Sequence, residues 1–176
     1  LITKREIDKI LSEYNTKRIK LATICSHSAL QIFHGARLEG FKVIGICNRN
    51  RKFVYDAFPL ARPDKYLLVD DFRQILQKDI QDQMIEDNVI IIAHGSFVEY
   101  VGSDELRKNF HVPMFGNRKT LEWESDRDKQ RQWLESAKLR LPKVYKRPSD
   151  IDKKVFVKLP GAKGGRGFFT ATSEND

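Results

Sequence analysis

Short apolar runs alternate with amphipathic segments along the first two thirds of the chain. Four apolar runs have the length and residue types of strands: 19–25, 42–47, 66–70 and 89–93. The last is wholly apolar, which is typical of a strand inside a parallel sheet. Because strand–helix–strand units build parallel sheets with right-handed crossovers, the pattern predicts an α/β fold with a Rossmann-like parallel sheet.

The segments between these runs predict helices with recognisable starts and stops. Thr3 and Glu6 form a capping box ahead of a first helix, and Ser28 and Gly40 bracket a second. The apolar spacing after Asp71 predicts one continuous helix that reaches residue 84. The prolines within 48–64 predict an irregular connection there.

The pattern changes near residue 116. A charged helical stretch begins at 117, and short strands are predicted at 144–146, 155–159 and 168–170. We therefore expect a parallel-sheet domain at 1–116 and a second, α+β domain that begins at 117 and runs to 176.

Composition narrows the class of protein. The net charge is +8 over 176 residues, but the basic residues are spread along the chain, so we expect no nucleic-acid partner. No apolar run approaches the ~20 residues that cross a bilayer, and the first 20 residues are dense in charge, so we expect a cytoplasmic protein without a membrane partner. Cys25 and Cys47 end apolar runs and are expected to be buried thiols in a reducing compartment.

Polar clusters follow three of the predicted strands. Ser26-His27-Ser28 comes after the first, Arg51 after the second and His94-Gly95-Ser96 after the fourth. Because parallel strands end at one edge of their sheet, and ligands bind at that edge, these clusters predict a substrate pocket. Its candidate residues are His27, Ser28, Arg51, Gly95 and Ser96. The alternative is a capping serine beside a surface histidine, a solvated basic loop and a structural histidine.

A second candidate site lies between the last two predicted strands. Lys158 ends one strand, and the loop after it holds Lys163, Gly164, Gly165, Arg166 and Gly167. Consecutive glycine N–H groups flanked by cations suit a nucleotide polyphosphate. The alternative is a glycine hairpin turn with solvated charges. The spacing is neither that of a P-loop nor that of the dinucleotide fingerprint.

The string V-F-V-K-L-P, with the glycine-rich turn and strand after it, resembles the phosphate-covering hairpin of the ATP-grasp ligases. Together with S-H-S at 26–28, H-G-S-F at 94–97 and M-F-G-N-R at 114–118, it resembles the archaeal formate-dependent formylating ligases of purine biosynthesis. The resemblance runs over essentially the whole chain.

The resemblance implies a pre-ATP-grasp substrate domain at 1–116 and the beginning of an ATP-grasp domain at 117–176. It implies ATP and Mg²⁺, with Mn²⁺ as a possible substitute, and formate and 5-amino-4-imidazolecarboxamide ribonucleotide as substrates. By resemblance the ribonucleotide contacts His27 and Ser96, with Ser28 and Gly95 beside them, and ATP contacts Lys158 and the glycine-rich loop. A homo-oligomer is also implied.

The family holds its metal with residues on a large domain that follows this hairpin. We therefore expect the chain to be the amino-terminal part of such an enzyme, incomplete for catalysis, with metal ligands outside it and no assignable catalytic residue. Two other functions stay open: an ATP-grasp amide-forming ligase that uses a different carboxylate, and a non-enzymatic nucleotide-binding module.

Overall fold

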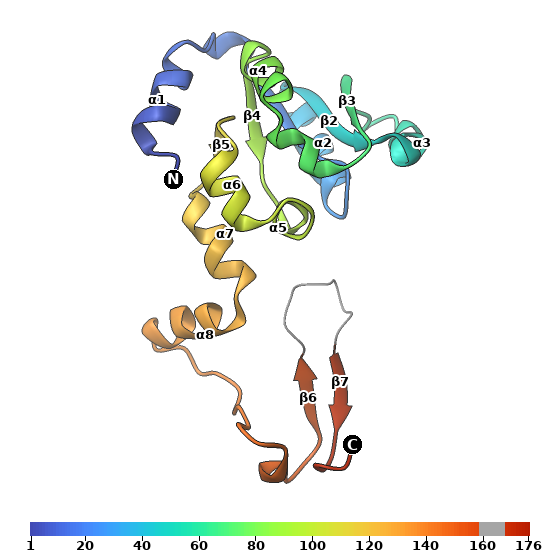
Figure 1. The fold of residues 1–176 in the computed structure, drawn as a ribbon. Helices are drawn as coiled ribbons and strands as arrows, with labels where there is room; N and C mark the ends of the chain where they lie inside the picture. The colour runs from blue at the N-terminus through green and yellow to red at the C-terminus, as the bar shows by residue number, and fades with distance from the viewer. Residues whose placement is uncertain (159–167) are drawn as a thin grey trace. The chain divides into compact units, whose positions relative to one another are not determined.

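The structure, a computed structural model, describes residues 1–158 and 168–176 (Figure 1). The chain forms two compact units, Leu1–Lys119 and Thr120–Asp176. Each unit has its own secondary structure and is treated separately below.

The first unit is built around a five-stranded parallel sheet. Its strands are β1 (Lys20–Ile24), β2 (Lys42–Asn48), β3 (Lys65–Val69), β4 (Val89–Ile92) and β5 (Met114–Phe115). The strand order is β3-β2-β1-β4-β5, and Leu21 of β1 lies between Val43 of β2 and Ile90 of β4. The predicted α/β fold with a parallel sheet is confirmed.

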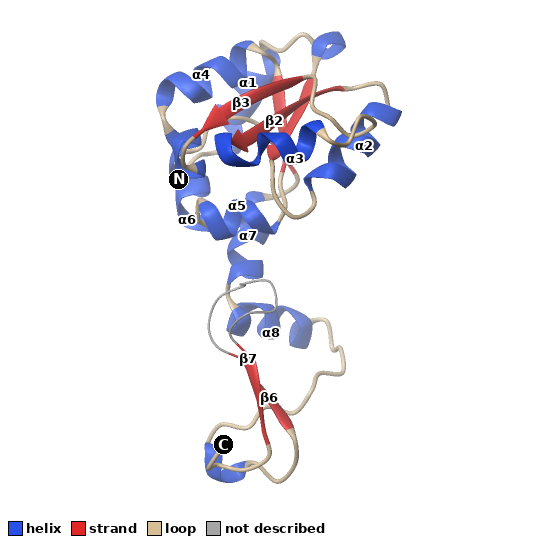
Figure 2. Ribbon diagram, turned by 90° about the vertical axis from the view of Figure 1, so that its right-hand side faces the viewer, coloured by secondary structure: helices blue, strands red, loops and turns tan. Residues whose placement is uncertain are grey.

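Helices precede, connect and follow these strands (Figure 2). They are α1 (Lys4–Ser12), α2 (Ala29–Leu38), α3 (Lys52–Asp56), α4 (Lys78–Glu86), α5 (Gly95–Tyr100), α6 (Ser103–Asn109) and α7 (Arg118–Ser125), the last of which crosses into the second unit. The predicted capping box of α1 is present, because Thr3 accepts from the Glu6 N–H while the Glu6 carboxylate accepts from the Thr3 N–H. Among the described residues, no helix combines the length and apolarity needed to cross a membrane.

One face of the sheet packs against α2. Phe33 and Ala36 of α2 lie in a buried cluster with Val43 and with the two cysteines that end the first and second apolar runs. Gly45 of β2 makes this packing possible, because a Cβ atom there would lie 2.8 Å from Pro63 Cγ and 2.9 Å from Cys25 Sγ. The residue after β1 and the segment before β3 therefore both lie against β2 at a position that has no side chain.

Three secondary-structure predictions were wrong. The connection 48–64 holds a 3-10 turn (Arg49–Arg51) and α3, because its prolines come only after both have ended. The predicted helix after Asp71 is two elements, since Gln77 adopts extended backbone angles between the 3-10 helix Phe72–Leu76 and α4. Residues 144–146 form no strand.

The second unit is small in its described part. It holds α8 (Arg127–Ser136), a 3-10 turn (Pro148–Asp150) and an antiparallel pair, β6 (Val155–Lys158) and β7 (Phe168–Ala171). The predicted helical stretch from 117 is two helices, because the Asp126 side chain accepts the N–H groups of Asp128 and Lys129 and starts α8 afresh. The predicted pairing of the strands around the glycine-rich segment is confirmed.

Candidate functional site

Two of the predicted polar clusters meet at one edge of the sheet. β1 and β4 are neighbours, and the loops after them carry Ser26-His27-Ser28 and His94-Gly95-Ser96. A direct contact joins the second loop to the end of β1, just before the first loop: the Nε2 atom of His94 lies 3.1 Å from the Ile24 carbonyl oxygen. The strand order turns back at this point, which is where parallel α/β sheets bind their ligands.

His94 holds this edge together as a neutral imidazole. Its Nδ1 atom accepts the Ser96 N–H at 3.3 Å and so caps α5, which leaves Nε2 to donate to Ile24. Burial lowers the pKa of His94, the Ile24 hydrogen bond raises it, and the charge of His27 nearby lowers it further; the net shift is downward. His94 therefore positions Ser96, a role that the sequence suggested only as a structural alternative.

The remaining predicted residues of these two loops differ in exposure. His27 is exposed, with Nδ1 at 3.3 Å from the Ser28 hydroxyl, whereas Ser96 is buried to 9% exposure. Gly95 faces open space, since no atom lies within 4 Å of the position a Cβ would take. The edge thus presents an exposed imidazole, a serine held in place and, at Gly95, open space where a side chain would otherwise stand.

Arg51 joins the same edge from β2. Its guanidinium carbon lies 5.9 Å from the centre of the Tyr100 ring, at the end of α5. The pKa of Tyr100 is lowered because the Ser26 side chain and then Arg51 hydrogen-bond to its hydroxyl. Sequence reasoning missed Tyr100; the available signal was its spacing, four residues after Ser96 on one helical face.

The two cysteines lie directly beneath these loops. Cys25 and Cys47 are buried free thiols, as predicted, and the Cys47 thiol donates to the Asn48 carbonyl oxygen at 3.3 Å. The neighbouring Cys47 thiol, together with burial, raises the pKa of Cys25. Contact with Cys25 lowers the pKa of Cys47, so the two buried thiols shift in opposite directions.

The second predicted site falls in the second unit. Lys158 is exposed at the end of β6, opposite Phe168 of β7. The predicted ATP-binding residues of the loop lie outside the described residues: Lys163, Gly164, Gly165, Arg166 and Gly167. In the described ranges 1–158 and 168–176, no three His, Cys, Asp or Glu residues are grouped as a metal site requires, so no described residues fit Mg²⁺.

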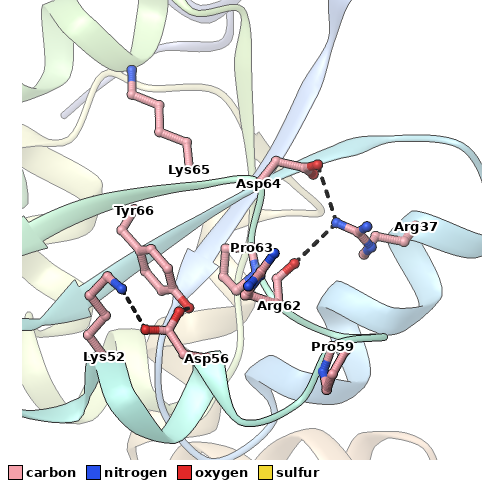
Figure 3. A pocket seen from close by; sticks show the side chains of 9 residues that line it. All are labelled: Arg37, Lys52, Asp56, Pro59, Arg62, Pro63, Asp64, Lys65 and Tyr66. Atoms are coloured by element: carbon pink, nitrogen blue, oxygen red, sulfur yellow. Dashed lines mark hydrogen bonds and ion pairs between the residues drawn. The ribbon is translucent and has the colours of Figure 1, made fainter.

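A cavity of about 420 Å³ lies elsewhere in the first unit (Figure 3). Its lining is Arg37, Lys52, Asp56, Pro59, Arg62, Pro63, Asp64, Lys65 and Tyr66. Most of its charges are already neutralised: Arg37 pairs with Asp64, Lys52 pairs with Asp56, and Lys65 points away from the rest. None of the sequence-predicted site residues lines it.

A parallel sheet whose order turns back between β1 and β4, with polar loops gathered at that turn, defines a doubly wound α/β domain of the ligand-binding kind. The family model described as "Protein of unknown function (DUF1246)" matches residues 21–145, and the chain belongs to this family.

Proteins with curated names are similar to the chain over nearly all of its length. It is 51% identical over 176 residues to a "5-formaminoimidazole-4-carboxamide-1-(beta)-D-ribofuranosyl 5'-monophosphate synthetase" of Korarchaeum cryptofilum. It is 50% identical over 171 residues to a protein of the same name in Methanococcoides burtonii. The matches cover 100% and 97% of this chain but 48% and 47% of the relatives. The chain thus spans about half the length of the relatives it matches.

The matches to solved structures agree with these sequence matches. The crystal structure of the IMP biosynthesis protein PurP from Thermococcus kodakaraensis matches with a TM-score of 0.64 and 30% identity, over 85% of this chain and 48% of that one. Biotin carboxylase from Campylobacter jejuni matches with a TM-score of 0.56 and 18% identity, over 89% and 39% of the two chains, which shows a shared fold alone. The predicted resemblance to the purine ligases is confirmed as a relationship of sequence and fold.

Proposed function

We propose that this chain is the ribonucleotide-binding domain, followed by the beginning of the ATP-grasp domain, of a ligase of purine biosynthesis. The ligase formylates 5-amino-4-imidazolecarboxamide ribonucleotide with formate and ATP, and releases the formamido ribonucleotide, ADP and phosphate. The observation that carries the proposal is the meeting of the Ser26–Ser28 and His94–Ser96 loops at the sheet edge, in a chain half identical to synthetases named for this product.

The edge suits a ribonucleotide for chemical reasons. The exposed imidazole of His27 can position a polar group of the substrate, and the hydroxyl of Ser96 sits where His94 has fixed its backbone. Gly95 leaves room for a ligand to approach the backbone, and Ser28 lies beside His27. In this proposal these residues bind and orient the amine nucleophile, and such orientation alone can contribute several kcal/mol, up to about 7–11, to catalysis.

The ATP part of the proposal rests on fewer described residues. Lys158 at the end of β6 offers an ammonium group for the nucleotide phosphates, and the loop 163–167 is the predicted partner of those phosphates. ATP supplies the phosphoryl group that activates formate. Mg²⁺ or Mn²⁺ is expected to be held by residues other than the described ones, and the homo-oligomer stays a prediction.

A formate-dependent assay of the full-length protein tests the proposal. We expect ADP release with ATP, the ribonucleotide and formate together, and none when formate or the ribonucleotide is left out. ADP release that requires a larger carboxylate in place of formate would instead show a different amide-forming ligase. No ADP release with any carboxylate, together with nucleotide binding, would show a non-enzymatic binding module.

A further inference from the structure

Three segments far apart in the sequence place Ser26, Arg51 and Tyr100 together at the carboxyl edge of the sheet. Ser26 follows β1, Arg51 closes the 3-10 turn after β2, and Tyr100 ends α5. The inference drawn from this group rests on the proposed function. It concerns the residues that determine which substrates the proposed site binds.

Arg51 keeps its positive charge unneutralised. It is exposed, and among the described residues it has no carboxylate within ion-pair distance. Its neighbours differ: Arg49 on the same turn pairs with Asp70 at 3.1 Å, and Lys52 pairs with Asp56. A guanidinium that stays unpaired beside two paired cations is available to an anionic ligand.

Tyr100 holds that guanidinium in place. The Arg51 guanidinium carbon lies 5.9 Å from the centre of the Tyr100 ring, and the neighbouring Ser26 side chain and Arg51 lower the pKa of the Tyr100 hydroxyl. The Tyr100 ring is itself fixed against Phe72, with ring centres 5.0 Å apart. The Tyr55 hydroxyl donates to the Ser26 carbonyl at 3.3 Å, which anchors the far side of the group.

We propose that Arg51 binds the phosphate monoester of the ribonucleotide, and that Tyr100, supported by Ser26, is the positioning residue that makes the site select phosphorylated over unphosphorylated ribosyl compounds. A guanidinium has five N–H donors in a planar fork, so one can bond the tyrosine oxygen while two others bind a phosphate. Stacking over an aromatic ring limits the rotamers of the arginine, so less freedom is lost when the phosphate binds.

The test is an affinity comparison on the full-length protein. Isothermal titration calorimetry measures binding of 5-amino-4-imidazolecarboxamide ribonucleotide, its nucleoside and ribose 5-phosphate. Arg51→Ala is expected to weaken binding of both phosphorylated compounds about 10- to 100-fold, since a hydrogen-bonded charge is lost, while nucleoside affinity stays unchanged. Arg49→Ala is the matched control, because it removes an equal charge two residues away that is already paired with Asp70, and it should leave all three affinities unchanged.

Tyr100 is tested with two variants. Tyr100→Phe keeps the ring and removes the hydroxyl, and is expected to weaken phosphate binding about 3- to 10-fold, as for one lost hydrogen bond. Tyr100→Ala removes both the ring and the hydroxyl. Its loss of affinity for the phosphorylated compounds should approach that of Arg51→Ala. Far-ultraviolet circular dichroism and the unfolding midpoint verify that each variant is folded before its affinities are compared.

The outcomes separate this inference from the proposed function. Equal loss of ribonucleotide and nucleoside affinity in the Arg51 variant, or unchanged phosphate selectivity in both Tyr100 variants, would overturn the inference. Failure of the wild-type protein to bind either phosphorylated compound would overturn it as well. Arg51-dependent binding of ribose 5-phosphate in a protein that shows no formate-dependent ADP release would refute the proposed function and support the inference.

Discussion

The two compact units of this chain bury their large apolar side chains to different extents. In the first unit the side chains of the sheet and of its helices enclose one another, and Phe33, Ile46 and Ile91 are almost wholly buried. In the second unit the hairpin leaves Phe156 and Phe168 largely exposed, although their rings lie 6.0 Å apart. A two-stranded hairpin alone is marginally stable at best in water. The comparison shows that the first unit buries its large apolar side chains, whereas the described hairpin of the second unit leaves two aromatic rings exposed.

The largest expected effect comes from removing one phenylalanine from each unit. Phe33→Ala should lower the free energy of unfolding by about 3–5 kcal/mol, because the side chain is 1% exposed and leaves a cavity in the core. Phe156→Ala is the matched control and should change it by about 0.5 kcal/mol or less, because that ring is 70% exposed. Urea unfolding followed by circular dichroism measures both, and equal losses would contradict the comparison.

A guanidinium in each unit gives the next largest effect. Arg118 donates to the carbonyl oxygens of Leu106, Phe110 and Val112, and burial lowers its pKa to about 10, so it stays charged at neutral pH. Arg118→Ala should cost about 2–3 kcal/mol of unfolding free energy, because buried carbonyls lose their donor.

The control for this change is Arg147→Ala in the second unit. Arg147 forms an exposed ion pair with Asp150, and its removal should cost about 0.5 kcal/mol or less. A cost for Arg118→Ala as small as that of the control would show that water replaces the buried donor, and would contradict the role of Arg118 as donor to these carbonyls of the first unit.

Ligand affinity offers a sharper test of the division between the units. His27→Ala should weaken ribonucleotide binding about tenfold and leave ATP binding unchanged, whereas Lys158→Ala should do the reverse, because each removes about 1.4 kcal/mol of contact from one ligand. Calorimetric titrations of the full-length protein with each ligand measure both constants. A variant that weakens both ligands equally would argue against separate sites.

The smallest effect concerns acid stability. Because burial keeps the pKa of His94 below its usual value of about 6.5, the unfolded chain takes up a proton more readily than the folded one. The stability that neutral His94 provides is therefore complete above about pH 6.5 and is lost as the pH falls below it. His94→Asn keeps an acceptor for the Ser96 N–H but does not titrate.

Unfolding free energies at about pH 7.5 and about pH 5 test this expectation. The wild-type protein should lose more stability between the two than His94→Asn does. An identical loss in both proteins would mean that other groups control acid unfolding.

The sheet was predictable from the sequence because burial on both faces imposes apolar runs, and those runs mark the strands well. The meeting of the Ser26–Ser28 and His94–Ser96 loops followed from the same logic, since parallel strands share an edge. The break at Gln77 and the short helix α3 were not predictable, because local backbone angles decide them and no proline or glycine marks either. Tyr100 was missed because its role depends on Arg51 and Ser26, which only the folded chain brings near it.

Gly45 restricts how this family member can vary. A methyl group there would press on Pro63 and on the sulfur of Cys25, which belong to two other segments of the chain. An alanine at position 45 would therefore require both a smaller side chain at position 25 and a displacement of Pro63. Replacement of Gly45 is thus coupled to two other positions, and this part of the sequence is expected to change by joint rather than single substitutions.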